Sequence, residues 1–290
     1  MSSQYRRPAA IPPNMGGSCE EIDARLAKVI QLLETAPIVP GQSVLDVGMG
    51  SGQLSMWLAQ KGLRVTGTGL ELDSYLTDPA RLSDLGVKTV PCSADSMPFN
   101  DASFDVVVMS HVLEHCPNQA LALAEVRRVL RNGGHLIVLV PAYTNAVCSG
   151  HVSTGWNVGQ LLYVLLLAGF CVQDGSFIEW CSNVCAFVTK REGMSLPALR
   201  GDRGDLHILS RAGLLPMQIK SDDGFDDGFC GDIGSINFTS ERAKMLKSPL
   251  KWRALSFVGF CIPLGAANLL FQLSRAIQTT HRVNPSTLTT

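Results

Sequence analysis

The stretch V-L-D-V-G-M-G-S-G, residues 44–52, decides the fold of this chain. Its first four residues, three of them apolar, predict a short parallel strand that is buried on both faces. The glycines that follow, Gly48, Gly50 and Gly52, predict a tight loop that a flat ligand can approach closely. An apolar-periodic segment, residues 54–58, comes next. The order strand, glycine loop, helix is typical of the first unit of a nucleotide-binding α/β domain.

The spacing of the glycines bears on which nucleotide could bind. The dinucleotide fingerprint G-x-G-x-x-G/A would place glycine or alanine at position 53, where this chain has Gln53. The chain instead carries D-x-G-x-G-x-G, with Asp46 two residues before the first glycine. An NAD-dependent oxidoreductase is therefore the less favoured interpretation of this loop.

The hydrophobic pattern after the loop alternates between strands and helices. Four further strands are expected, at residues 63–70, 87–90, 104–109 and 135–140. An apolar helix at 158–168 precedes two strands, 170–178 and 183–190, whose short connection predicts an antiparallel pair. We therefore expect an α/β fold: a Rossmann-like, seven-stranded, mostly parallel sheet with helices on both faces, plus a C-terminal helical extension.

Changes in composition divide the chain into three parts. Residues 1–17 contain several prolines and glycines without an apolar core, so a disordered N-terminal tail is expected there. Residues 18–190 form the α/β domain, which begins with an amphipathic helix capped at Ser18. Residues 191–290 form a C-terminal extension, in which the pattern of the core fold stops.

The extension contains the most hydrophobic stretch of the chain, residues 254–271. Its eighteen residues lie at the lower limit for a bilayer span, and Pro263 and Asn268 interrupt it. Basic residues flank both ends, so the charge pattern does not assign an orientation. Three interpretations stay open: a packed helical pair, a shallow peripheral contact with a membrane, or a span.

Charge and cysteine content narrow the class of protein. The 290 residues carry a formal net charge of -1, so nothing in the composition favours a nucleic-acid partner. The nine cysteines are odd in number and contain no C-x-x-C pair, which is typical of reduced thiols rather than of a disulfide framework. A cytoplasmic protein is therefore expected.

Four separate stretches together resemble one known family. They are V-L-D-V-G-M-G-S-G (44–52), A-D-S-M-P-F-N-D-A-S-F-D-V-V (94–107), S-H-V-L-E-H (110–115) and R-V-L-R-N-G-G-H-L (128–136). In order and spacing they resemble the motifs of the class I S-adenosylmethionine-dependent methyltransferases, in the branch that acts on small molecules, lipids and sugars. The resemblance covers roughly residues 40–190 and implies S-adenosyl-L-methionine as the cofactor.

The resemblance also implies which residues bind that cofactor. The glycines would approach its methionine part and ribose, and Asp46 would favour the ammonium group or position a water beside it. Asp95 would accept a hydrogen bond from the adenine amino group, and the backbone around Ala94 would complete adenine recognition. The expected cofactor-binding residues are Asp46, Gly48, Gly50, Gly52, Glu71, Ala94, Asp95 and Ser110.

One position departs from the family pattern. The second strand of the family usually ends in an acid that binds both ribose hydroxyls, and that position is Gly69 here. Glu71 lies two residues on and would point to the same side of an extended strand. We assign the ribose role to Glu71, with Asp73 in reserve; a solvated turn carboxylate is the alternative.

A hydroxyl acceptor would need a base, and histidines lie near the ends of the fourth and fifth strands. His115 is the candidate base and His151 the candidate substrate contact, although a structural role for His115 stays open. A helix beginning at His111 would place His111 and His115 on one face. The run H-V-L-E-H nevertheless differs from the H-E-x-x-H zinc pattern and shows no third ligand, so no metal is expected.

We expect an enzyme that transfers a methyl group from S-adenosylmethionine to a small-molecule or lipid- or glycan-linked acceptor, at oxygen or carbon. Methyltransferases that act on exocyclic base nitrogens carry D/N-P-P-Y/F after the fourth strand, where this chain has S-H-V-L, which argues against nucleic acid as the acceptor. The alternatives are a non-catalytic S-adenosylmethionine-binding module and, less favoured, an NAD-dependent oxidoreductase.

Overall fold

A computed structural model describes residues 38–143, 150–180, 183–201, 205–216 and 235–236, together with Val29, Ile30, Leu33 and Ala36. The predicted N-terminal tail, most of the helix expected to begin at Ser18, and the apolar segment 254–271 lie outside the described residues. Within the described part of the chain, each helix is too short or too polar to cross a membrane.

The described residues form one sheet with helices between most of its strands. The strands are β1 (Ser43–Val47), β2 (Arg64–Gly69), β3 (Lys88–Pro91), β4 (Phe104–Ser110), β5 (Leu130–Pro141), β6 (Phe170–Trp180), β7 (Asn183–Lys190) and β8 (Ser235–Ile236). The helices are α2 (Gln53–Gln60), α3 (Leu72–Tyr75), α4 (Pro79–Asp84), the 3₁₀ turn η1 (Leu113–His115), α5 (Gln119–Val129), α6 (Val158–Leu167) and α7 (Asp205–Arg211).

The sheet order is β3-β2-β1-β4-β5-β7-β6-β8. Strands β1 to β5 pair in parallel, whereas β7 runs antiparallel to both β5 and β6, as predicted for the last two strands. All seven predicted strands are present, and the two-residue β8 extends the edge beside β6. The expected start of the fifth strand at residue 135 is too late, because Leu130 already pairs with Phe104.

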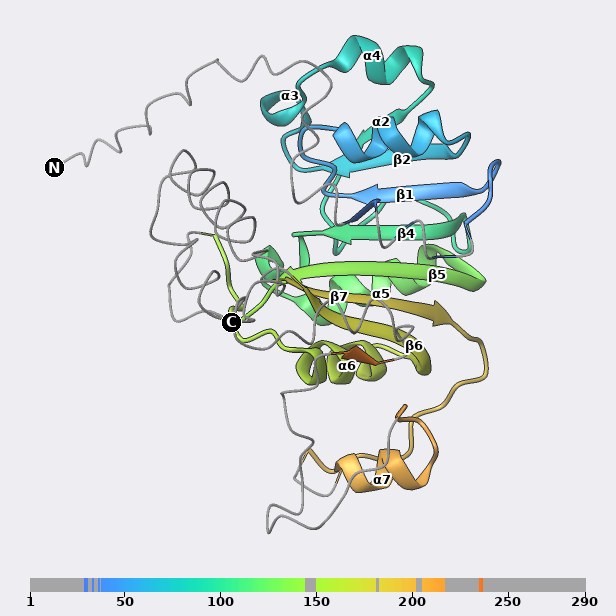
Figure 1. Ribbon diagram of the computed structural model, residues 1–290, viewed down its shortest axis with the longest axis vertical. Helices are drawn as coiled ribbons and strands as arrows, with labels where there is room; N and C mark the ends of the chain where they lie inside the picture. The colour runs from blue at the N-terminus through green and yellow to red at the C-terminus, as the bar shows by residue number, and fades with distance from the viewer. Residues whose placement is uncertain are drawn as a thin grey trace, which may run out of the picture.

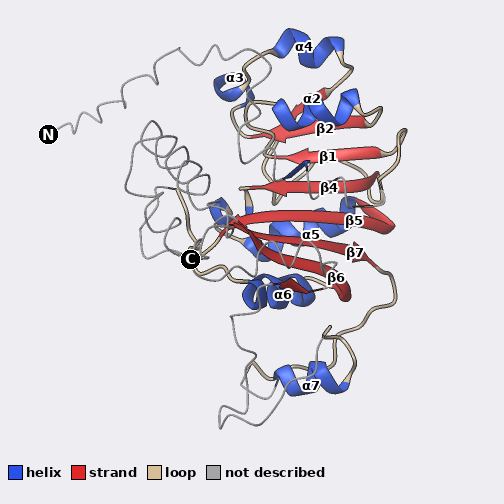
Figure 2. Ribbon diagram, viewed as in Figure 1, coloured by secondary structure: helices blue, strands red, loops and turns tan. Residues whose placement is uncertain are grey.

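Helices cover both faces of the sheet, and alternate residues of each central strand explain why (Figure 2). Along β4, Val107 belongs to a buried cluster that includes side chains of α5 and α6. Its neighbours Val106 and Val108 point the other way and pack with α2 and α4. Because successive side chains of a strand face opposite sides, an unbroken apolar run requires a cover on each face.

The chain order in the sheet reverses beside β1, which separates β2 and β3 from β4 and β5. In open α/β sheets, ligands bind beyond the carboxyl ends of the strands at such a reversal. The arrows of β1, β2 and β4 end on the same side of the molecule in Figure 1, and α3 lies beyond that edge. The loops that follow these strands are therefore where a functional site is expected.

Candidate active site

The loop after β1 keeps its three glycines for different reasons. Gly48, Gly50 and Gly52 have φ of 67°, 51° and 81°, a backbone region that side chains disfavour. A Cβ at Gly48 would lie 2.5 Å from Val112 Cγ2, and one at Gly52 would lie 2.9 Å from Leu82 Cδ1. At Gly50 a Cβ would meet no atom within 4 Å. The outer glycines thus allow protein packing, whereas Gly50 leaves an open face that a ligand can approach.

Asp46 lies in β1 just before this loop and is almost completely buried, with 2% of its surface exposed. The hydroxyl of Ser55 in α2 donates a hydrogen bond of 2.7 Å to its Oδ2. Burial raises the pKa of Asp46 to about 7, although the hydrogen bond from Ser55 opposes the shift. A cation placed beside this carboxyl group would favour its charged form.

The turn after β3 presents Asp95 at the surface. Ser96 N donates to the carbonyl of Ser93 at 3.2 Å, which closes a tight turn around Ala94 and Asp95. The Ser93 hydroxyl donates to Asp95 Oδ1 at 2.5 Å and so orients the carboxylate. Asp95 is exposed and Ala94 is half-buried, so both are accessible to a ligand.

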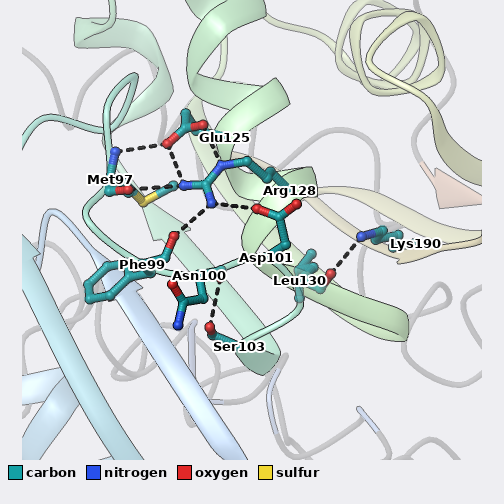
Figure 3. A network of polar contacts seen from close by, with 9 residues as sticks. All are labelled: Met97, Phe99, Asn100, Asp101, Ser103, Glu125, Arg128, Leu130 and Lys190. Carbon is teal, nitrogen blue, oxygen red and sulfur yellow. Dashed lines mark hydrogen bonds and ion pairs between the residues drawn. The ribbon is translucent and has the colours of Figure 1, made fainter.

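Arg128 of α5 anchors the segment that carries Asp95, a role that the sequence did not reveal (Figure 3). Its guanidinium donates to both oxygens of Glu125, at 2.7 and 2.9 Å, and to Asp101 at 2.8 Å. It also donates to the carbonyl of Met97 at 3.0 Å, while Met97 N donates to Glu125 at 2.8 Å. The hydrogen bond from Arg128 is the main reason why the pKa of Glu125 is lowered. The only sequence signal was the arginine that opens R-V-L-R-N-G-G-H-L.

The loop after β2 accounts for the glycine where the family usually has an acid. A Cβ at Gly69 would lie 2.9 Å from Leu72 Cδ2, so a larger residue would require the Leu72 side chain to shift. Glu71 is exposed at the N-cap position of α3 and makes no side-chain capping hydrogen bond to that helix. Its carboxylate therefore remains available to a ligand, and the ribose assignment stays a prediction.

The chain after β4 does not form an α-helix that begins at His111. Ser110 ends β4 as the partner of Leu139, and His111 follows with φ of 57°. Only Leu113–His115 are helical, as a single 3₁₀ turn. The shared α-helical face that such a helix would give His111 and His115 is therefore absent from this segment. The positive φ instead directs His111 Nδ1 to Glu114 Oε1, at 3.2 Å.

The structure brings together His115 and His151, which lie far apart in the sequence. Their rings meet edge to face, with centroids 4.7 Å apart and planes at 82°. His115 Nδ1 lies 2.9 Å from the carbonyl of Gly150. The carboxylate of Glu114, which is completely buried, completes a cluster in which one possible ligand atom of each residue lies within 4.8 Å of the others.

Comparison with known proteins identifies the fold family. Residues 45–138 match a family model described as a methyltransferase domain. The ubiquinone/menaquinone biosynthesis C-methyltransferase UbiE of Paraburkholderia phymatum is 38% identical over 109 residues, which are 36% of this chain and 45% of that protein. Residues 45–138 of this α/β domain thus match the methyltransferase-domain family, in agreement with the resemblance to the class I S-adenosylmethionine-dependent methyltransferases.

The methyltransferase domain has further relatives that agree with this family. The sterol 4-C-methyltransferase of Caenorhabditis elegans is 26% identical over 144 residues, which are 47% of this chain and 41% of that protein. The chain thus spans less than half the length of these two curated relatives. The solved structure of the [4+2]-cyclase SpnF covers 58% of this chain and 81% of its own, with a TM-score of 0.51 and 20% identity, a likeness that shows the fold alone.

The methyltransferase domain places the predicted residues in two groups at one edge of its sheet. Asp46, the glycine loop, Glu71, Ala94 and Asp95 follow or end β1, β2 and β3. Ser110, His115 and His151 follow or end β4 and β5. The two groups meet where Val112 packs over Gly48. Such an edge can hold a nucleotide on one side and a second molecule on the other.

Proposed function

We propose that this protein transfers a methyl group from S-adenosyl-L-methionine to a small-molecule or lipid- or glycan-linked acceptor, at oxygen or carbon. The observation that carries the proposal is the open face of Gly50 beside the buried carboxyl group of Asp46, at the reversal point of the sheet. An open glycine loop suits a ligand that lies flat against the backbone, and a buried carboxyl group suits its ammonium group. The residues present therefore fit the family's cofactor.

Each predicted cofactor residue has a place in this proposal. Asp46 would hold the ammonium group, and Gly48, Gly50 and Gly52 would shape the loop against the methionine part and ribose. Glu71 would accept hydrogen bonds from the ribose hydroxyls. Asp95, held by Ser93 and indirectly by Arg128, would accept one from the adenine amino group, with the backbone at Ala94 beside it. Ser110 would border the methyl group, because it ends β4 at the same edge.

Exposed apolar side chains at this edge favour an acceptor with apolar surface. Leu70 and Tyr75 follow β2 and are 76% and 64% exposed. Tyr143 and Val152 follow β5 and are 66% and 59% exposed. In this proposal an apolar part of the acceptor would contact these side chains. Two curated relatives, named for ubiquinone/menaquinone biosynthesis and for a sterol, support a lipid-type acceptor.

The protein would have to align the acceptor with the methyl group, exclude water from the site and, for a hydroxyl acceptor, remove one proton. The bound cofactor supplies a methyl group that is already activated. His115 and His151 face the acceptor side in this proposal, His115 nearest to the proton of a hydroxyl acceptor and His151 in contact with the acceptor itself. We place the enzyme in the cytoplasm, with residues 254–271 as its peripheral contact when the acceptor lies in a membrane.

The test combines binding and turnover in the full-length protein. Calorimetry should show micromolar binding of S-adenosylmethionine and poor binding of NAD. Incubation with quinone-type, sterol-type and phenolic acceptor pools should then yield S-adenosylhomocysteine. Cofactor binding without any product across all pools would instead favour a non-catalytic S-adenosylmethionine-binding module, and absence of binding would reject both.

A further inference from the structure

Three side chains with metal-binding atoms converge beside the proposed acceptor site. Glu114 and His115 come from η1, and His151 comes from the loop between β5 and α6. One possible ligand atom of each lies within 4.8 Å of the other two. No third ligand for the H-V-L-E-H run was visible in the sequence, because His151 reaches this run only through the fold.

Each of the three residues has a lone pair that its protein neighbours leave unused. The carbonyl of Gly150 can only accept, so His115 Nδ1 carries the hydrogen and Nε2 of the neutral ring is free to bind. Glu114 Oε1 is held by His111, whereas Glu114 Oε2 is buried and has no hydrogen-bond partner. His151 Nδ1 is likewise buried without a partner. Buried polar atoms without partners are costly and point to a missing ligand.

The cluster is held in place by hydrogen bonds that do not use these free atoms. The amides of Val152 and Ser153 donate to the carbonyl of Glu114, at 2.8 and 3.3 Å, and fasten the His151 loop to η1. Gln119 Nε2 adds bonds to Ser153 Oγ at 2.7 Å and to the carbonyl of Leu113 at 3.0 Å. Outer partners that fix ligand orientation are typical of metal sites.

His111 has an unusual backbone conformation. It is one of two non-glycine residues with positive φ among those that the structure describes, and that backbone is strained. The strain places His111 Nδ1 against Glu114 Oε1, which orients the carboxylate while leaving Oε2 free. Such a contact is expected of a residue that positions a ligand without binding the metal itself.

We propose that Glu114, His115 and His151 form a binding site for one divalent transition-metal ion of the Zn²⁺ type. Two imidazoles and one carboxylate match the ligands that such ions prefer. Bond lengths of about 2.0–2.2 Å put neighbouring ligand atoms roughly 3.3–3.6 Å apart, so the side chains must approach by about 1 Å on binding. His115 is exposed, which leaves the outer side of the ion open for a further ligand.

The open coordination position of the proposed metal ion bears on which acceptor could bind. A hydroxyl or carbonyl oxygen of the acceptor fits that position, so the metal site favours an oxygen-bearing acceptor over a pure hydrocarbon. This consequence rests on the proposed function, whereas metal binding itself does not. His115 and His151 would then act on the acceptor through the bound ion.

Metal binding is tested first, on full-length protein without cofactor. Calorimetry with Zn²⁺ and with Mn²⁺, after removal of metal by a chelator, should show one site per chain. His115→Gln and His151→Gln should each weaken that site at least tenfold. His207→Gln, in α7 away from the cluster, is the matched control and should bind as the parent does. Mn²⁺ is included because it avoids thiolates, so the nine cysteines do not mimic the result.

The outcomes separate this proposal from the proposed function. Equal affinities in the parent, His115→Gln and His151→Gln, or no binding at millimolar Mn²⁺ and Zn²⁺, would overturn the metal site. Glu114→Gln should also lose the ion, and its thermal unfolding checks that the buried substitution leaves the fold intact. Metal binding with no S-adenosylhomocysteine formation would uphold the site and count only against methyl transfer. Methyl transfer that chelation leaves unchanged would reject the consequence for the acceptor.

Discussion

The two sides of the site are built in different ways. On the cofactor side, Asp46 and the glycine loop come from one continuous stretch, and Asp95 lies in a turn closed by its own neighbours. On the acceptor side, Glu114 and His115 gain their partner His151 only when the loop after β5 returns to η1. Each part of the cofactor side is therefore local in sequence, whereas the pairing of His115 with His151 on the acceptor side depends on the fold. This difference explains why a shared cofactor can be recognised from sequence while the acceptor cannot.

The largest expected effect is on the cofactor side, at Gly50. Gly50→Ala should weaken S-adenosylmethionine binding at least tenfold, because the added methyl group would enter the open face of the loop. Because the backbone at this position has φ of 51°, the alanine should also lower the free energy of unfolding by about 1–2 kcal/mol. Calorimetry and thermal unfolding measure the two effects.

Gly86→Ala is the matched control for backbone strain. Gly86 also has a positive φ, 72°, with no atom within 4 Å of an added Cβ, but it precedes β3 at the opposite edge. It should lose similar stability and keep its cofactor affinity. Equal loss of affinity in both variants would mean that strain alone explains the Gly50 result, which would remove the loop from the binding site.

The second effect is a pH dependence that only the cofactor side should show. The pKa of Asp46 is raised to about 7 in the free protein, and an ammonium group beside it would lower that pKa. Binding below pH 7 then releases a proton, so affinity should fall by up to about tenfold per pH unit as pH drops and level off above pH 7. Calorimetry between pH 5.5 and 8.5 measures the slope.

Asp46→Asn tests whether Asp46 causes this slope. The amide cannot take up the charge, so the variant should bind more weakly than the parent at pH 8, by about 1–3 kcal/mol, and should not show the step near pH 7. A variant that keeps the parent's slope would assign the titration to another group. That result would also mean that Asp46 does not bind the ammonium group of the cofactor.

The sequence predicted most of the fold because the fold depends on local pattern. The apolar run of β4 and the final pair β6 and β7 are visible from hydrophobicity and turn residues alone. The start of β5 was predicted too late, at residue 135, because Leu130 follows α5 directly and pairs with Phe104. That pairing joins distant segments and has no local signal.

The candidate site was predictable only where its residues share one motif. Asp46 and the glycines were assigned through the resemblance of one motif, and they lie in β1 and the loop that follows it. The anchoring role of Arg128 was not visible, because its partners lie in the turn segment after β3. The strained backbone of His111 was also hidden, since positive φ in a histidine has no sequence signature. Roles of this kind arise from contacts across the fold.

The smallest expected effect concerns the ribose, where this chain departs from the family. If Glu71 binds both ribose hydroxyls, Glu71→Gln should weaken S-adenosylmethionine binding by about 0.5–1.5 kcal/mol, since an amide offers one acceptor atom where a carboxylate offers two. Asp73→Asn is the matched control and should change affinity less. The effect is modest because Glu71 is exposed and water can replace a lost contact.

A cofactor analogue without the 2′-hydroxyl group identifies which contact is lost. The parent should bind the analogue more weakly than S-adenosylhomocysteine, and Glu71→Gln should lose most of that preference, because one partner of the hydrogen bond is already altered. If Asp73→Asn loses the preference instead, the ribose role belongs to Asp73. If both variants keep the preference, neither carboxylate binds the 2′-hydroxyl group. The glycine at position 69, against which Leu72 packs, would then have no acidic residue nearby that takes over the ribose role. The cofactor side would then be held by its glycine loop, Asp46 and Asp95 alone.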